Sequence, residues 1–160
     1  MDEIENPIEM TTANRGTDRH RNRFNGHSDP EPMKVIVVDD DKDVLEVVAA
    51  IFECIGCNVK KASGGNEALL SILGEQFDLL VTDYDMPDLN GYQLAIAVKD
   101  DSPMTGVLIM TGFAQSDVAT ELNSGLADGW LFKPFGIDAV QELLGNINHK
   151  KGGRFLQYGQ

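Results

Sequence analysis

Two runs of apolar residues in this 160-residue chain each end on acidic side chains. The first run is Val37–Asp40, and the second is Leu79–Asp83. A nearly continuous apolar run is typical of a strand buried on both faces of a parallel sheet, and open parallel sheets place their ligand sites at the carboxyl ends of the strands. The pattern therefore predicts that Asp39, Asp40 and Asp83 meet at one edge of a sheet.

Carboxylates that crowd together repel one another and resist ionisation unless a cation neutralises them. Hard cations such as Mg2+ bind carboxylate and carbonyl oxygens. We therefore expect Asp39, Asp40 and Asp83 to hold Mg2+, with one carboxylate left for chemistry. The alternative is an acidic helix start, because acids favour a helix N-terminus, and we apply it to Asp41.

From Met33 onward, strand-like segments alternate with helix-like segments. The apolar spacing and the Gly and Pro positions predict strands at 34–38, 59–63, 79–83, 107–111 and 130–132. The same features predict helices at 65–73, 92–99, 116–124 and 137–147, and a first helix that is capped by Asp41 and stops at Gly56. The apolar face of this first helix is predicted at Val44, Val47, Val48, Ile51 and Ile55. Parallel strands need helical crossovers, so the fold class is α/β, a doubly wound five-stranded parallel sheet with five helices.

The folded domain is expected at residues 33–150. Residues 1–32 are polar and have too few apolar side chains to form a core, so we expect a disordered N-terminal arm. The basic cluster of this arm, from Arg15 to Arg23, is either a solvated tail or a docking segment for an acidic partner. Residues 151–160 are expected to be a flexible tail that is too short to fold alone.

The charge of the chain limits its partners. Residues 34–160 carry 9 Lys and Arg against 19 Asp and Glu, a net charge of −10. Lys and Arg supply most of the affinity for nucleic acid, so we expect no direct nucleic-acid binding. The sequence contains no apolar stretch long enough for a membrane span and no signal-peptide pattern, so we expect no membrane insertion and a cytoplasmic protein.

Cys54 and Cys57 form a C-x-x-C pattern of the kind found in redox proteins. Reactive thiols are activated at helix N-termini, whereas Cys54 is predicted near the C-terminal end of its helix. A structural zinc needs further Cys or His ligands, and none is nearby in the sequence. We therefore expect two reduced thiols in or near the core.

Four short motifs follow one another along the predicted strand ends. They are Val37–Asp40, Asp83 with Met86-Pro87 and Gly91, Met110–Gly112, and Lys133–Phe135. Together they resemble the receiver domain of two-component response regulators, and the resemblance covers residues 33 to about 150. It implies a flavodoxin-like sheet with the strand order 2-1-3-4-5, of the kind found in the chemotaxis regulator.

The resemblance also implies the roles of individual residues. Asp83 would be the phosphoacceptor, which takes a phosphoryl group from a sensor histidine kinase or a phosphotransfer protein. Thr111 would be the switch hydroxyl, and Lys133 would be the phosphate-binding ammonium, with a cis peptide bond to Pro134. The implied Mg2+ ligands are Asp39, Asp40, Asp83 and the backbone carbonyl of Asp85.

Three residues depart from, or vary within, the usual family pattern. Gly112 follows the switch Thr and leaves space beside the site. Trp130 stands where receivers usually carry a Tyr, Phe or smaller switch residue, so it is either a switch aromatic or a fixed packing residue. Asp85 adds a negative charge near the phosphoryl oxygens, which bears on the lifetime of the phosphorylated state.

We expect a stand-alone receiver that catalyses only its own phosphorylation and dephosphorylation. It would signal through phosphorylation-dependent contacts with an unidentified downstream protein. One alternative is a binding module that has kept the fold and is not phosphorylated. The other is a small phosphatase of the Asp-x-Asp kind, suggested by Asp83-Tyr84-Asp85, in which the second Asp is a general acid.

Overall fold

The computed structural model describes residues 31–150. The predicted tail at 151–160, and all but the last two residues of the predicted arm at 1–32, lie outside this range. The described part forms a five-stranded parallel sheet in the order β2-β1-β3-β4-β5. This order confirms the predicted doubly wound α/β fold.

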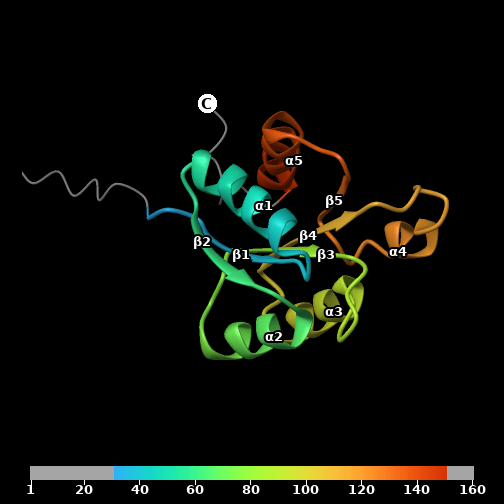
Figure 1. Ribbon diagram of the computed structural model, residues 1–160, viewed down its shortest axis with the longest axis horizontal. Helices are drawn as coiled ribbons and strands as arrows, with labels where there is room; N and C mark the ends of the chain where they lie inside the picture. The colour runs from blue at the N-terminus through green and yellow to red at the C-terminus, as the bar shows by residue number, and fades with distance from the viewer. Residues whose placement is uncertain (1–30, 151–160) are drawn as a thin grey trace, which may run out of the picture. The chain divides into compact units, whose positions relative to one another are not determined.

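Each strand is followed by a helix, as Figure 1 shows. The strands are β1 (Lys34–Val38), β2 (Asn58–Ala62), β3 (Leu79–Asp83), β4 (Gly106–Thr111) and β5 (Gly129–Phe132). The helices are α1 (Lys42–Cys54), α2 (Gly65–Gly74), α3 (Gly91–Asp101), α4 (Ala119–Asn123) and α5 (Ile137–Lys150).

The sheet lies between two layers of helices. Successive strand side chains point to opposite faces, so Val35 and Val37 pack in one core cluster with residues of α1 and α5. Ile36 and Val38 pack in the other cluster with residues of α2 and α3. In Figure 1, α1 and α5 accordingly lie on one face of the sheet, and α2 and α3 lie on the other.

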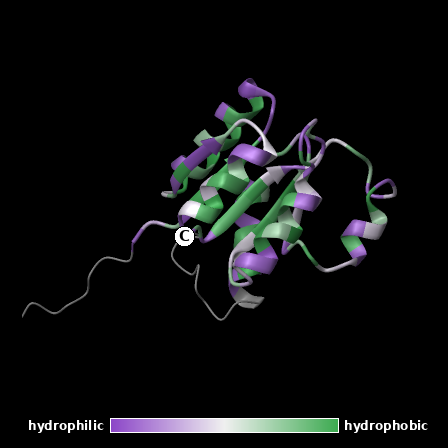
Figure 2. Cartoon of the chain, turned by 90° about the horizontal axis from the view of Figure 1, so that it is seen from below, coloured by the Kyte–Doolittle hydropathy of each residue, from purple (hydrophilic) through white to green (hydrophobic). Residues whose placement is uncertain are grey.

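The central strands β1, β3 and β4 are almost entirely buried. In Figure 2 the hydrophobic colour is strongest along the central strands, whereas the helices carry both colours. Burial on both faces explains why these strands are continuous apolar runs in the sequence. The runs of β1 and β3 stop at aspartates where the chain leaves the sheet, and the run of β4 stops at Thr111.

Helix α1 buries most of the predicted face, with Val47 as the exception. Val48 is buried, and Val44, Ile51 and Ile55 pack half-buried against the core. The buried side chains of the helix are Leu45, Val48, Ala49 and Phe52, whereas Val47 is 62% exposed. The helix is apolar on much of its circumference, so more than one stripe satisfies helical spacing. Contact with the sheet decides which stripe is buried. The ends were predicted correctly, because the Asp41 carboxylate accepts the N–H groups of residues 43 and 44, and Gly56 has a positive φ of 90°.

Helix α4 is shorter than predicted, because its first helical residue is Ala119 rather than Ser116. The Ser116 hydroxyl donates to the Asp117 carboxylate, and the Asp117 N–H donates to the carbonyl of Ala114, which forms a turn. Ser116 therefore does not cap the helix. None of the five residues of α4 is buried, so packing does not extend the helix either.

Cys54 is exposed and Cys57 is buried, and both thiols in the described chain are free. Burial, helped by the negative charge of Asp78, raises the pKa of Cys57 to about 12. The Cys57 thiol is therefore protonated and unreactive at neutral pH, as expected for a core residue. Across residues 31–150, no helix combines the length and the apolar character that crossing a membrane requires.

Candidate functional site

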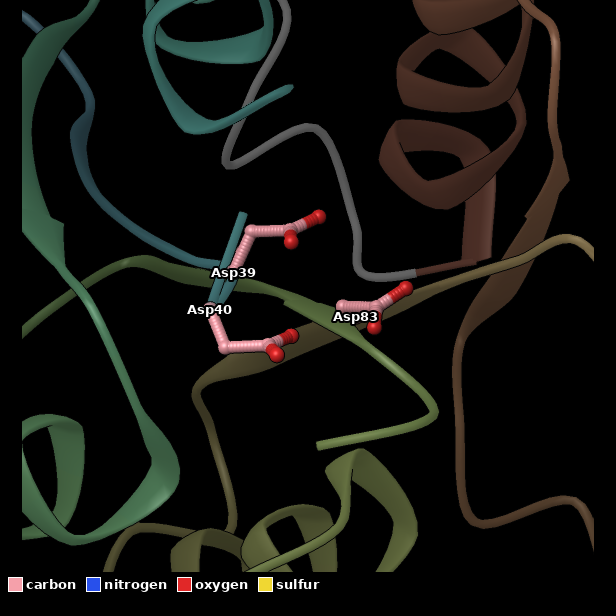
Figure 3. Close-up of side chains that lie close together, drawn as sticks. All are labelled: Asp39, Asp40 and Asp83. Carbon is pink, nitrogen blue, oxygen red and sulfur yellow. The ribbon is translucent and has the colours of Figure 1, made fainter. Parts of the chain in front are cut away.

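The carboxyl ends of β1 and β3 bring three aspartates together. Asp39 and Asp40 directly follow β1, and Asp83 is the last residue of β3, which pairs with β1. One carboxylate oxygen from each of the three lies within 4.8 Å of the other two. Figure 3 shows the three side chains side by side at the sheet edge. The predicted meeting of Asp39, Asp40 and Asp83 is therefore found in the structure.

Lys133 reaches this acidic cluster from the end of β5. Its ammonium Nζ lies 2.7 Å from Asp83 Oδ1 and 3.1 Å from Asp39 Oδ2, so it donates to both carboxylates. Asp39 is 1% exposed and Asp83 is 7% exposed, so water screens these charges weakly. One half-buried cation thus joins two of the three carboxylates.

Burial and hydrogen bonding shift the pKa values of Asp83 and Lys133. Burial raises the pKa of Asp83, and the hydrogen bond and charge of Lys133 oppose this effect, whereas Asp39 and Asp40 reinforce it. Burial also acts to lower the pKa of Lys133, but its hydrogen bonds to Asp83 and Asp39 outweigh burial and raise the pKa. The ammonium therefore stays charged, and Asp83 is the carboxylate whose ionisation costs free energy.

Thr111 is the last residue of β4, the strand next to β3, and it is 1% exposed. Its hydroxyl oxygen accepts the N–H of Phe113, and its carbonyl accepts the N–H of Lys133. The peptide bond between Lys133 and Pro134 is cis, as the family resemblance implied. Thr111 therefore stands at the same sheet edge as the acidic cluster and is bonded to the backbone of Lys133.

Trp130 is half-buried on β5 and packs against the core cluster of α2 and α3. Its ring centroid lies 6.0 Å from that of Tyr84, the residue after Asp83. Tyr84 also makes an edge-to-face contact with Phe113 at 5.9 Å, and its hydroxyl donates to Glu121 of α4 at 3.0 Å. This aromatic cluster connects the loop after β3 to α4 and β5, and nothing in the sequence beyond the residue types predicts it.

Asp85 has an exposed side chain and is not one of the three clustered carboxylates. It lies in the loop between β3 and α3, together with Asp88 and Asn90, which the sequence indicates as turn residues. Asn90 caps α3 in a capping box with Gln93, whereas Asp88 reaches across to the start of α2. The contact made by Asp88 was not predicted.

The acidic cluster is suited to binding Mg2+. Its donors are carboxylate oxygens, which hard cations prefer, and their spacing allows a single ion to contact all three side chains. Within residues 31–150, Lys133 is the cation that bonds this cluster, through Asp39 and Asp83. The third carboxylate, that of Asp40, is exposed.

Comparison with known proteins identifies the class to which this fold and site belong. The family model for the response regulator receiver domain matches residues 35–145, and the chain belongs to that family. The match confirms the resemblance carried by the strand-end motifs.

Individual relatives agree with this assignment. Chemotaxis protein CheY of Pseudomonas aeruginosa is 30% identical over 124 residues, which cover 76% of this chain and 100% of that protein. Virulence sensor protein BvgS of Bordetella bronchiseptica is 34% identical over 119 residues, but this chain spans only 10% of its length. The solved structure of chemotaxis response regulator CheY4 of Vibrio cholerae matches with a TM-score of 0.67 and 28% identity, and the match covers 73% of this chain and 99% of that one.

Proposed function

We propose that this receiver accepts a phosphoryl group on Asp83 from a phosphohistidine of a sensor histidine kinase or a phosphotransfer protein. The observation that carries the proposal is the Lys133 ammonium, which bonds Asp83 and Asp39 within the acidic cluster. A carboxylate and a phosphoryl group repel each other, so a fixed cation at the point of attack lowers the cost of their approach.

The transfer is a nucleophilic substitution at phosphorus. A carboxylate oxygen of Asp83 attacks the phosphorus, an O–P bond forms, and the N–P bond to the donor imidazole breaks, with its electron pair kept by the nitrogen. Lys133 stabilises the charge on the phosphoryl oxygens. Thr111 then donates its hydroxyl proton to one of those oxygens, a donor that its present bond leaves available because there the hydroxyl oxygen accepts the Phe113 N–H.

The cofactor of this reaction is proposed to be Mg2+. Asp39, Asp40, Asp83 and the backbone carbonyl of Asp85 would hold it, and the clustering of the three carboxylates supports this assignment. When bound, Mg2+ neutralises negative charge on the carboxylates and on the phosphoryl oxygens. The output is proposed to be phosphorylation-dependent contact with a downstream protein, without nucleic-acid binding or membrane insertion, in the cytoplasm.

A surface groove beside Lys133 supports a protein as the donor. The groove measures about 360 Å³ and lies between α1 and the segment after β5, with Val47, Ile51, Pro134 and Phe135 among its lining residues. Lys133 lines this groove and also bonds Asp83, so a protein that presents phosphohistidine to Asp83 covers the groove.

Chemical labelling tests the proposal. The wild-type chain is incubated with a small acyl phosphate with and without Mg2+, and the adduct is mapped by mass spectrometry. We expect one phosphoryl group on Asp83 that requires Mg2+ and is absent from Asp83→Asn. The matched control Asp100→Asn removes an exposed carboxylate on α3 and should label normally.

Three results would contradict the proposal. Full labelling of well-folded Asp83→Asn would show that the acceptor lies elsewhere. Absence of labelling in the wild type, with intact fold, favours the binding-module alternative. Sustained turnover of a phosphomonoester, lost in Asp85→Asn, would instead favour the Asp-x-Asp phosphatase.

A further inference from the structure

The loop between β3 and α3 carries Asp85, whose backbone carbonyl is the proposed fourth Mg2+ ligand. Its two ends are fixed by backbone hydrogen bonds, because the Tyr84 N–H donates to Met110 and the Gly91 N–H donates to the Tyr84 carbonyl. Residues 84–90 form no helix or strand. The position of the Asp85 carbonyl therefore depends on how the middle of this loop is held.

Asp88 ties the middle of the loop to helix α2. Its Oδ2 accepts the N–H of Asn66 at 2.9 Å, and its Oδ1 accepts the N–H of Gly65 at 3.2 Å. These are first-turn N–H groups, which have no partner within the helix. The N-cap residue of α2 is Gly64, which has no side chain to cap them. The carboxylate of Asp88 thus serves as the N-cap of a helix that lies 22 residues away in sequence.

The start of α2 leaves room for this contact. A Cβ atom at Gly64 would lie 3.1 Å from Asp88 Oδ2, and a Cβ atom at Gly65 would lie 2.5 Å from the Leu89 carbonyl oxygen. The loop therefore lies directly against the backbone of the helix. Hydrogen bonds from backbone N–H groups, first that of Asn66, lower the pKa of Asp88, so its carboxylate is charged at neutral pH and favoured by the helix dipole.

We propose that Asp88 is a positioning residue for the Mg2+ site, because it holds the loop in the conformation that aims the Asp85 carbonyl at the three carboxylates. The proposal rests on the proposed function. Only Met86 and Pro87 lie between Asp85 and Asp88, so a displaced Asp88 leaves the carbonyl freer to turn away. The apparent affinity for Mg2+ falls in proportion to the fraction of molecules whose loop is correctly placed.

The test measures the dissociation constant for Mg2+ from amide chemical shifts during titration with magnesium chloride. Asp88→Ala should weaken binding by about tenfold, the lower end of what loss of an outer supporting residue costs a metal site. Asp88→Asn keeps one acceptor oxygen and should fall between Asp88→Ala and the wild type. Asp100→Asn removes the same charge from an exposed position and should bind like the wild type.

A double variant separates positioning from helix capping. In Gly64→Ser with Asp88→Ala, the serine hydroxyl replaces the lost cap locally, and the backbone at residue 64 is extended, which any residue adopts. The crowding of Gly64 against Asp88 Oδ2 is also absent. Thermal melts should show that α2 capping and stability recover. The Mg2+ affinity should stay weak, because the loop is still untied.

The outcomes are distinct. If the affinity recovers together with the melting temperature, Asp88 acts only as a helix cap and the proposal is overturned. Equal Mg2+ affinity in wild type and Asp88→Ala also overturns it, while the proposed Mg2+ site stands. If the wild type itself binds no Mg2+, the proposed cofactor is wrong and the positioning role falls with it.

Discussion

Gly91, the first residue of α3, lies directly against the backbone of the proposed phosphoacceptor. A Cβ atom there would stand 2.1 Å from the Asp83 carbonyl oxygen and 2.9 Å from the Asp83 carbonyl carbon, whereas real Cβ atoms essentially never come within 3.0 Å of another group. Gly91→Ala therefore requires α3 and the end of β3 to separate by roughly 0.9 Å, the difference between these distances. Both partners are backbone, so no side chain can rotate away.

We expect Gly91→Ala to lower the free energy of unfolding by about 3 kcal/mol, the upper end of the usual cost of overpacking. The assay is urea unfolding with linear extrapolation. Because Asp83 itself is displaced, labelling by a small acyl phosphate should also slow under conditions where the variant is folded.

The matched control makes the same chemical change where there is space. At Gly145 in α5, no described atom lies within 4 Å of the added Cβ. Alanine favours a helix interior over glycine, so Gly145→Ala should raise the free energy of unfolding by up to about 1 kcal/mol. A Gly91→Ala protein as stable as the wild type would refute the argument that close backbone contact requires glycine at this position.

Three further predictions concern the site and its surroundings. The pKa of Asp83 is raised in the folded protein, first by burial, so its ionisation removes stability as pH rises above the ordinary value of 3.8. The Asp83→Asn side chain cannot ionise, so this variant should resist urea better than the wild type in metal-free buffer at pH 7. The difference should shrink at pH 3, and equal stability at pH 7 would contradict the prediction. Burial and then the hydrogen bond to Glu121 raise the pKa of Tyr84, so Glu121→Gln should lower that pKa, and an unchanged ultraviolet titration curve would show that the bond is not formed in solution. If Trp130 is a switch residue, beryllofluoride with Mg2+ should change its fluorescence and Thr111→Ala should blunt the change; constant emission at confirmed occupancy would make it a packing residue.

The sequence predicted the sheet and the acidic edge because both depend on local patterns. Strands β1 and β3 are buried on both faces, so each is an uninterrupted apolar run, and a parallel sheet collects the residues that follow such runs. Asp39, Asp40 and Asp83 could therefore be placed together from their positions alone. The contact of Lys133 with them rested on the family resemblance, because β5 is short and only partly buried.

Other features could not be predicted because tertiary contacts decide them. The buried face of α1 depends on which of several apolar stripes meets the sheet, and Val47 was assigned wrongly for that reason. The Tyr84 to Glu121 bond joins residues 37 apart in sequence. The start of α2 carried an indirect signal, since a helix that begins with two glycines and no capping side chain needs its cap from elsewhere.

Helix α4 contributes no buried side chain. One of its contacts is the hydrogen bond that the Tyr84 hydroxyl donates to the carboxylate of Glu121. Substitutions on such a helix leave the core unchanged, since surface changes away from packed contacts alter stability little. The exposed residues of α4, Thr120 and Asn123, can therefore vary without endangering the fold. This segment combines a direct contact with the residue after Asp83 and freedom to vary in sequence, so new partner preferences can arise here by a few substitutions.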